Sequence, residues 1–176
     1  MTMSDSVQQL IQGNAGFATH RFASGLKIIP SLKIFVIGCV DPRVDPSLIL
    51  GLDLGESAVI RNIGGRVTSS VLDELVLLRK LTQAAGGDFD QGWTFVVLQH
   101  TDCGILRMQG ERSKLAGFFG VDEGSLEAKC VGDPHAAVGG DIAAIRGAHD
   151  LPSGMHCVGM VYDVNTGLVE VATGLE

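Results

Sequence analysis

The sequence has few basic residues and no long apolar run, and each shortage excludes a class of protein. Its 13 Lys and Arg stand against 20 Asp and Glu, a formal net charge of -7 over 176 residues. Proteins that bind a nucleic-acid backbone need clustered positive charge, so we expect no nucleic-acid partner. A membrane helix needs about 18 consecutive apolar residues, and the longest apolar run here, at about 34–40, has the length of a strand. We therefore expect no membrane partner either.

Several common motifs are also missing. Residues 1–12 show no basic segment followed by an apolar core, so we expect no signal peptide and a cytoplasmic location. The four Cys, at positions 39, 103, 130 and 157, form no CxxC pair. In a chain without an export signal, such Cys are more often thiols or metal ligands than disulfides. No phosphate-binding loop, dinucleotide fingerprint or GxSxG sequence occurs, so nucleotide binding and serine hydrolysis have no support.

Short apolar segments separated by glycines and helix-type patterns make up the rest of the chain. Apolar runs predict strands at about 33–38, 57–60, 93–98, 155–163 and 168–172, the last two joined as a hairpin. Apolar spacing and capping residues predict helices at about 4–18, from Thr68 or Ser69 through Leu81, and from Asp133 to about Ala148. The interval 107–132 is expected to be irregular or built of short helices.

Strands that alternate with helices predict an α/β fold. We expect a mainly parallel central sheet of four strands, an antiparallel C-terminal edge strand, and helices on both faces. No repeat or linker divides the sequence, so residues 1–176 are expected to form a single domain with an N-terminal helical arm at about 1–25.

The candidate chemistry follows two of the predicted strands. Cys39, Asp41 and Arg43 come after the first strand, whereas His100 and Cys103 come after the third. Right-handed crossovers place the carboxyl ends of both strands at the same edge of the sheet, where ligands collect. Two thiolates and an imidazole suit Zn²⁺, and three protein ligands leave a fourth position open, as in catalytic zinc sites. The alternative is that these are unrelated buried thiols and a hydrogen-bonded histidine, because a bare HxxC occurs by chance in many chains.

Three sequence blocks resemble the signature blocks of the β-class carbonic anhydrases. These blocks are Cys39-Val-Asp41-Pro-Arg43, Val59-Ile-Arg-Asn-Ile-Gly-Gly-Arg-Val67 and His100-Thr-Asp-Cys-Gly104. Their order and spacing agree with the family, as does the strand–helix alternation over nearly the whole chain. The closing Val161-Tyr-Asp-Val-Asn-Thr-Gly167 is also similar to the last strand and turn of that family.

The resemblance implies a function and a site. It implies Zn²⁺ bound by Cys39, His100 and Cys103, and reversible hydration of CO₂ to bicarbonate by a zinc-bound hydroxide. It also implies an Asp41–Arg43 dyad, and a homodimer or higher homo-oligomer with the site near the subunit interface. Asp41 can accept a hydrogen bond from the hydroxide or move onto the metal as a fourth ligand, and the guanidinium of Arg43 can hold its carboxylate away. A surface Asp–Arg pair without a role is the alternative for these two residues.

Two residues depart from the family pattern. Pro42 replaces the usual Ser, which removes a hydroxyl and a backbone N–H but biases Asp41 toward extended geometry. We therefore expect zinc binding to survive, and the orientation of the Asp41–Arg43 dyad and turnover to be the properties affected. Val36 stands where family members with a non-catalytic bicarbonate site carry Trp, so no such regulatory site is expected.

Two further functions remain open at the level of sequence. Carbonyl sulfide and carbon disulfide are linear molecules like CO₂, and enzymes that hydrolyse them resemble the same family. A non-catalytic zinc protein, with Asp41 permanently on the metal, is the other alternative.

Overall fold

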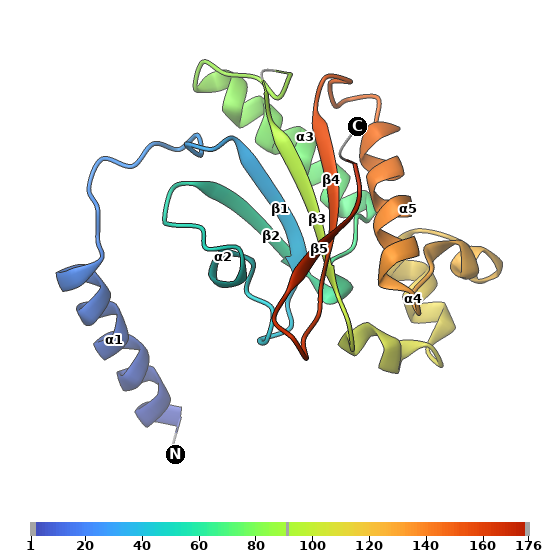
Figure 1. Cartoon of the computed structure of the whole chain (residues 1–176), viewed down its shortest axis with the longest axis horizontal. Helices are drawn as coiled ribbons and strands as arrows, with labels where there is room; N and C mark the ends of the chain where they lie inside the picture. The colour runs from blue at the N-terminus through green and yellow to red at the C-terminus, as the bar shows by residue number, and fades with distance from the viewer. Residues whose placement is uncertain (1–2, 91, 175–176) are drawn as a thin grey trace.

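A five-stranded sheet forms the centre of the molecule. The computed structural model describes residues 3–90 and 92–174 (Figure 1). The strands lie in the order β2-β1-β3-β4-β5. Their bounds are Ile34–Cys39 (β1), Ser57–Asn62 (β2), Thr94–His100 (β3), His156–Tyr162 (β4) and Val169–Thr173 (β5). The first four are paired in parallel, whereas β5 is antiparallel to β4, which confirms the predicted sheet.

The described residues also form five α-helices and three 3₁₀ helices. The α-helices are α1 (Met3–His20), α2 (Pro46–Ile49), α3 (Ser69–Ala84), α4 (Arg112–Phe119) and α5 (Pro134–Arg146), and the 3₁₀ helices are η1 (Ile63–Gly65), η2 (Gly104–Met108) and η3 (Glu123–Lys129). The N-terminal helix caps that the sequence predicts are present in the structure. Thr68 accepts a hydrogen bond from the N–H of Val71 at the start of α3, and Asp133 caps α5 ahead of Pro134.

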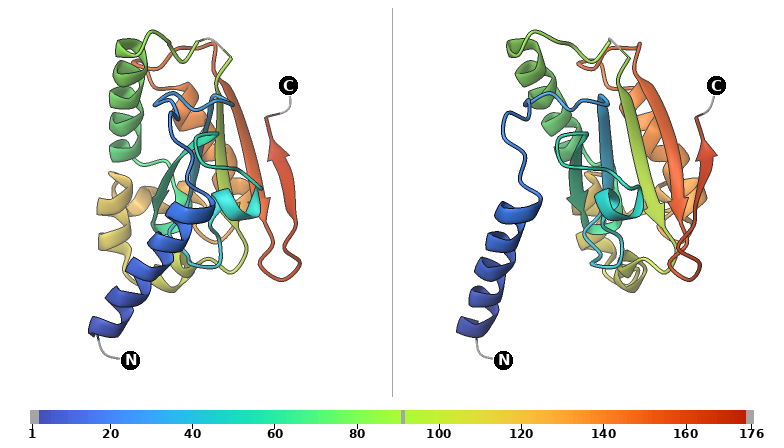
Figure 2. Two further views of the ribbon diagram at one scale, coloured as in Figure 1. Left: turned by 90° about the vertical axis from the view of Figure 1, so that its left-hand side faces the viewer. Right: turned by 60° about the vertical axis from the view of Figure 1, so that its left-hand side comes forward.

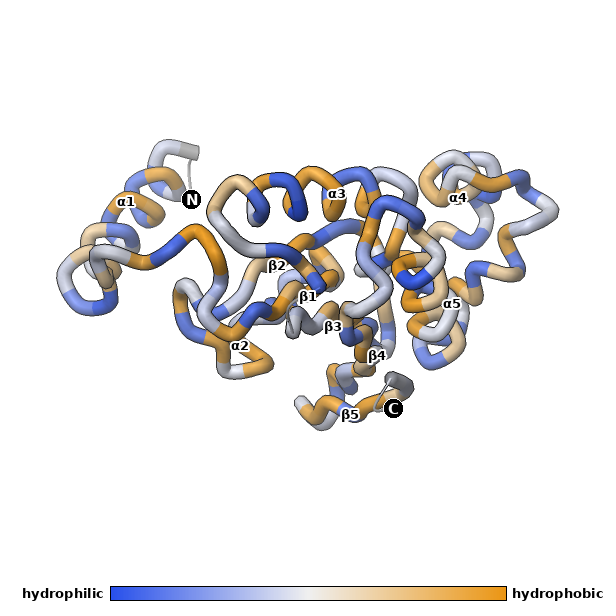
Figure 3. The backbone as a smooth tube through the Cα atoms, turned by 90° about the horizontal axis from the view of Figure 1, so that it is seen from above, coloured by the Kyte–Doolittle hydropathy of each residue, from blue (hydrophilic) through white to orange (hydrophobic). Residues whose placement is uncertain are grey.

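The two faces of the sheet are covered unequally. The main core packs α3 and α5 against one face, where Phe35, Ile37, Phe95 and Val97 of the strands lie. Short α2 lies on the opposite face (Figure 3), where Ile49 packs near Val36, Val96 and Leu98. Helices on both faces were expected, and the structure adds that α3 and α5, the two long helices packed on the sheet, share one face.

The segment between β3 and α5 forms a second apolar cluster. Its members Ile105, Leu115, Phe119 and Leu126 come from η2, α4 and η3 and pack with Cys39 and Cys103. The interval that the sequence predicts as irregular therefore supplies the apolar side chains that pack around the ends of β1 and β3.

Helix α1 stands apart from the sheet and from the other helices. A long connection separates it from β1, as Figure 1 and the right-hand view of Figure 2 show. Its apolar side chains are exposed, with Val7 at 51%, Leu10 at 74% and Ile11 at 64% of full exposure. Of the helices in the described residues, none combines the length and apolarity needed to cross a bilayer.

Candidate metal centre

The two strands that carry the predicted ligands lie side by side. Cys39 ends β1 and His100 ends β3, and the strands pair in parallel register, with Gly38 opposite Leu98. Cys103 returns to the same place after a tight turn in which Asp102 has a φ of 50°. One ligand atom from each of Cys39, His100 and Cys103 lies within 4.8 Å of the others, and all three residues are buried. The parallel sheet thus brings together the three side chains that the sequence predicts to meet.

The imidazole of His100 is oriented for a metal. Its Nδ1 lies 2.9 Å from the carbonyl oxygen of Thr101, so Nδ1–H donates there and the lone pair remains on Nε2. Nε2 is buried, and it is the only such side-chain nitrogen or oxygen without a hydrogen-bond partner in residues 3–90 and 92–174. A buried polar atom without a partner is costly. Coordination to a cation at the Cys–His–Cys cluster removes that cost.

The two thiols share the same space. Cys39 Sγ and Cys103 Sγ are 3.7 Å apart, and the backbone N–H of Asp41 points at Cys39 Sγ from 3.4 Å. Donation from the Cys103 thiol is the main cause that lowers the pKa of Cys39, and it outweighs burial, which acts to raise that pKa. The same contact and burial raise the pKa of Cys103. Because a divalent cation lets both sulfurs ionise, and because two sulfurs with one imidazole are ligands that zinc favours, the cluster fits a zinc ion.

Asp41 faces Arg43 rather than the cluster. Asp41 Oδ1 accepts the backbone N–H of Arg43 at 2.9 Å and its Nε at 3.0 Å, and Oδ2 accepts Nη2 at 2.8 Å. Hydrogen bonding to Arg43 is the main reason that the pKa of Asp41 falls to about 2. The Asp41–Arg43 pair has the geometry of the expected dyad, and a move of Asp41 onto the metal stays a prediction.

The contacts of Asp41 also account for Pro42. The turn is closed by the N–H of Arg43, two residues after the Asp41 carboxylate that accepts it. The N–H that proline lacks is therefore not needed. The contacts between Asp41 and Arg43 therefore form with Pro42 between the two residues.

Two residues near the site escape prediction from sequence. Arg61, near the end of β2, donates to the carbonyl oxygens of Cys39 and Asp41, each at 2.9 Å. It also donates to Val44 O at 3.3 Å and pairs with the carboxylate of Asp45 at 2.9 Å. Asp102 accepts a hydrogen bond from Arg43 Nη1 at 2.9 Å. An Arg directly after the apolar residues 58–60 was the available signal for Arg61, whereas nothing in the sequence links Asp102 to Arg43.

A small cavity opens beside the cluster. Its volume is about 210 Å³, and its lining consists of Cys39, Val40, Asp41, Pro42, Ile63, Gly64, Gly104 and Ile105. Most of this lining is apolar, with the Asp41 carboxylate as the charged group. The cavity suits a small molecule with little polarity that must approach both the cluster and Asp41.

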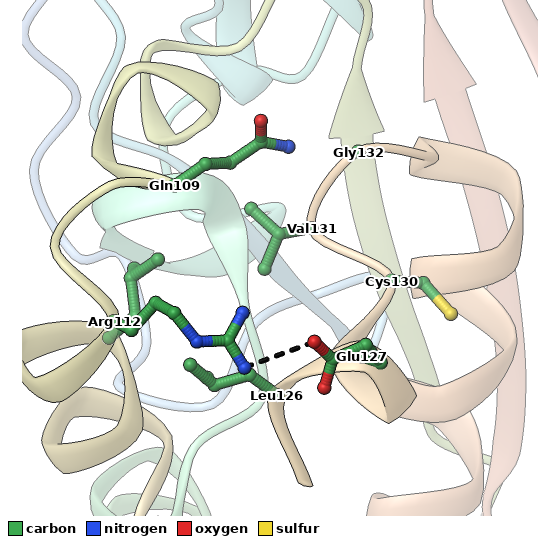
Figure 4. Close-up of a pocket in the computed structure, with 8 residues that line it drawn as sticks. Gln109, Arg112, Leu126, Glu127, Cys130, Val131 and Gly132 are labelled. Carbon is green, nitrogen blue, oxygen red and sulfur yellow. Dashed lines mark hydrogen bonds and ion pairs between the residues drawn. The ribbon is translucent and has the colours of Figure 1, made fainter. Parts of the chain in front are cut away.

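A second cavity, about 360 Å³, lies beside α4 and η3 and is unconnected with the predicted ligands (Figure 4). Leu115, Leu126 and Val131 provide apolar lining, and an Arg112–Glu127 ion pair of 3.0 Å crosses it. The thiol of Cys130 points away from the other labelled side chains. Cys157 lies in β4 and is buried in the main core, as its position in an apolar run predicts.

Comparison with known proteins agrees with this geometry. The family described as "Carbonic anhydrase" matches residues 34–120, which hold all three ligand candidates. "Beta-carbonic anhydrase 1" of Mycobacterium tuberculosis is 32% identical over 116 residues, 66% of this chain and 64% of that protein. "Carbon disulfide hydrolase" of Saccharolobus solfataricus is 29% identical over 123 residues, 69% of this chain and 53% of that protein. The matched region thus spans just under two thirds of the mycobacterial relative and about half of the archaeal one.

Solved structures extend the likeness to nearly the whole chain. The crystal structure of a carbonic anhydrase from Streptococcus mutans superposes with a TM-score of 0.75 and 27% identity, covering 98% of this chain and all of that one. A carbonic anhydrase from Glaciozyma antarctica, 24% identical with a TM-score of 0.70, shares the fold. With its sequence blocks, its Cys–His–Cys cluster and its sheet order all in agreement, the chain belongs to the β-carbonic anhydrase family.

Proposed function

We propose that this protein hydrates CO₂ reversibly to bicarbonate at a zinc ion held by Cys39, His100 and Cys103. The observation that carries the proposal is the buried Cys–His–Cys cluster, in which His100 Nε2 has no hydrogen-bond partner among the described residues. When bound there, zinc lowers the pKa of a coordinated water and so supplies a hydroxide nucleophile near neutral pH.

The residues around the cluster have distinct roles in this proposal. Asp41, with a pKa of about 2, is ionised at neutral pH and acts as a hydrogen-bond acceptor in the cavity. Arg43 fixes both oxygens of that carboxylate, which directs its remaining lone pairs. Ile63 and Ile105 give the cavity apolar walls that accept CO₂ and exclude part of the water. Asp41 serves as a fourth ligand only when it leaves Arg43.

We also propose that the protein is a cytoplasmic homodimer or higher homo-oligomer. The support is the α1 stripe, formed by Val7, Leu10 and Ile11, which is exposed although an apolar stripe on a helix normally packs against another surface. A second copy of the chain offers exposed apolar side chains of its own, such as Leu48 on α2 and Leu54 after it. In this proposal residues 1–176 act as one domain, and α1 is the arm that reaches the partner.

Carbon disulfide or carbonyl sulfide is the alternative substrate. The support is that two matching relatives, from Saccharolobus solfataricus and from an Acidianus strain, are named carbon disulfide hydrolase. The same cluster and apolar cavity serve either reaction, so only turnover separates them.

Stopped-flow measurement of CO₂ hydration across pH, with a parallel assay for sulfide released from carbon disulfide, tests the proposal. We expect CO₂ hydration that rises with pH as the nucleophile deprotonates. Sulfide release without CO₂ hydration would mean that carbon disulfide, and not CO₂, is the substrate. No turnover of either compound at any pH would mean that the protein binds zinc without catalysing these reactions.

Replacing Asp41 with Asn tests the role given to the dyad. The change should lower kcat about 100-fold, within the range for groups that control proton position, while the zinc content stays near that of the parent. Asp73→Asn, at an exposed position on α3, is the matched control and should leave kcat unchanged. Full activity in Asp41→Asn would remove the dyad from the mechanism.

A further inference from the structure

The guanidinium of Arg43 is shared by two carboxylates from two different loops. Nε and Nη2 donate to Asp41, on the loop after β1. Nη1 donates to Asp102 Oδ2 at 2.9 Å, and Nη2 also reaches the backbone oxygen of Asp102 at 2.9 Å, on the loop after β3. Arg43 therefore joins the loop that carries Cys39 to the loop that carries His100 and Cys103.

The backbone of Asp102 is shaped for this contact. Its φ of 50° lies in the left-handed region, which Asp tolerates better than most residues and Gly adopts freely. This conformation presents both the carbonyl and the carboxylate of one residue to the same guanidinium. The chain therefore adopts this unfavourable backbone conformation between His100 and Cys103, two of the three ligand candidates.

Arg43 needs a second anchor because its side chain is long and 47% exposed. An exposed Arg held at one end by a single carboxylate keeps much rotamer freedom. With Asp102 on the far side, the guanidinium is held from two directions while it grips Asp41, which is only 11% exposed.

We infer that Asp102 is a positioning residue, which fixes Arg43 so that Arg43 keeps the Asp41 carboxylate turned away from the Cys–His–Cys cluster. The effect on turnover rests on the proposed function, whereas the effect on Arg43 does not. Asp102 is not among the residues that line the cavity beside Asp41. Its loss should therefore lower kcat and leave KM for CO₂ unchanged.

The variants Asp102→Gly and Asp102→Asn distinguish the contribution of the Asp102 side chain from that of its backbone. Gly keeps the left-handed backbone and its carbonyl contact but removes the carboxylate, and Asn keeps an oxygen acceptor without the charge. A role confined to backbone shape predicts no loss in the Gly variant. Anchoring by the carboxylate predicts the largest loss in Gly and a smaller one in Asn.

The direct measurement is hydrogen exchange of the Arg43 Nε–H group by NMR, on the metal-free full chain with reduced thiols. Arg43→Lys assigns the signal by removing it, and Asp73→Asn is the control. We expect Asp102→Gly to speed this exchange up to about fivefold, the range for one exposed ion pair, with Asp102→Asn between Gly and the parent. Unchanged exchange in Asp102→Gly would overturn the inference.

Kinetics of the zinc-loaded variants give the second measurement. We expect kcat for CO₂ hydration to fall most in Asp102→Gly and less in Asp102→Asn, the same order as the increase in Arg43 exchange. KM should stay constant. A protein that hydrates no CO₂ overturns the proposed function, but the NMR result still decides whether Asp102 holds Arg43. Faster exchange with an unchanged kcat would contradict the positioning role.

Discussion

Gly65 is the residue at which the backbone of the site has no room for a side chain. It has a φ of 61°, and a Cβ placed there would lie 2.7 Å from the backbone nitrogen of Cys39 and 2.8 Å from the carbonyl carbon of Gly38. These neighbours are main-chain atoms of β1, so they move only if the strand moves. The side-chain amide of Gln99 donates to Gly65 O at 2.7 Å and holds the turn against β3.

Gly65→Ala should therefore displace Cys39 as well as destabilise the protein. We expect the free energy of unfolding to fall by more than about 2 kcal/mol, the sum of left-handed strain and overpacking, together with a loss of zinc content. Gly51→Ala is the matched control, because Gly51 has a φ of 64° with no atom within 4 Å of its Cβ position. Urea unfolding should show only the strain there, about 1 kcal/mol. Equal losses in both variants would mean that the close approach to Cys39 has no cost.

Arg66 and Asp141 show how a buried charge pair joins separate elements. Arg66 Nε donates to Asp141 Oδ2 at 2.7 Å, so the pair connects the segment after β2 to α5. The guanidinium also lies 4.9 Å from the centre of the Phe119 ring of α4 and donates to Lys129 O. Burial raises the pKa of Asp141, and the hydrogen bond and charge of Arg66 act against that rise. The attraction within such a pair is largely offset by the cost of removing both charges from water, so its net contribution to stability is small.

At the scale of elements, the end of α3 is tied to the loop that follows it. Arg79 Nε donates to Asp88 Oδ1 at 2.8 Å, and Gln83 Nε2 donates to Asp88 Oδ2 at 2.7 Å. Hydrogen bonding to Arg79 is the main cause that lowers the pKa of Asp88, followed by Gln83. In the main core, the Phe89 ring meets the Phe35 ring edge to face, and Trp93 stacks on Phe35.

Asp88→Asn should weaken this tie in a pH-dependent way. A carboxyl whose pKa is lower in the folded state contributes stability above its unfolded pKa of about 3.9, and loses that contribution as pH falls further. We expect the variant to be less stable by up to about 1 kcal/mol at pH 7. Urea unfolding of parent and variant should show this difference shrinking below about pH 4. A difference that stays constant or grows toward low pH would contradict the ion-pair account.

The strands and long helices were predictable because each has a local cause. The buried run at 33–38 and the cap at Thr68 act on their own residues, and β1 and α3 begin close to where these signals place them. The interval 107–132 was not predictable in detail. Short α4 and η3 depend on distant contacts, such as those of Phe119 with Arg66 and of Leu126 with the cluster around Cys39.

The residues of the site also divide into those that could be predicted from the sequence and those that could not. Cys39, His100 and Cys103 were predictable because parallel topology brings strand ends to one edge, and the structure places them there. The grip of Arg43 on Asp41 follows from their spacing of two residues. Asp102 and Arg61 were missed, because their partners lie 59 and 16 to 22 positions away and no pattern in the sequence connects them.

At the scale of the whole molecule, α1 should bind a second copy of the chain. Replacing Leu10 and Ile11 by Ser removes two of the three side chains in the α1 stripe, so we expect the molar mass in solution to fall toward that of one 18.5 kDa chain. Light scattering after size-exclusion chromatography measures it. Gln8→Ser and Gln9→Ser, on the same helix, are controls that should keep the assembly. A parent protein that is itself monomeric would contradict the proposed role of α1.

The central claim is that one zinc ion is held by Cys39, His100 and Cys103. Zinc K-edge X-ray absorption on the purified chain tests it most directly, with Cys130→Ser as a control outside the cluster. We predict about one zinc per chain with two sulfur ligands at about 2.3 Å and a nitrogen ligand at about 2.0–2.1 Å, unchanged in Cys130→Ser and with one sulfur lost in Cys39→Ser. Protein without zinc, or zinc bound without sulfur, would contradict the account.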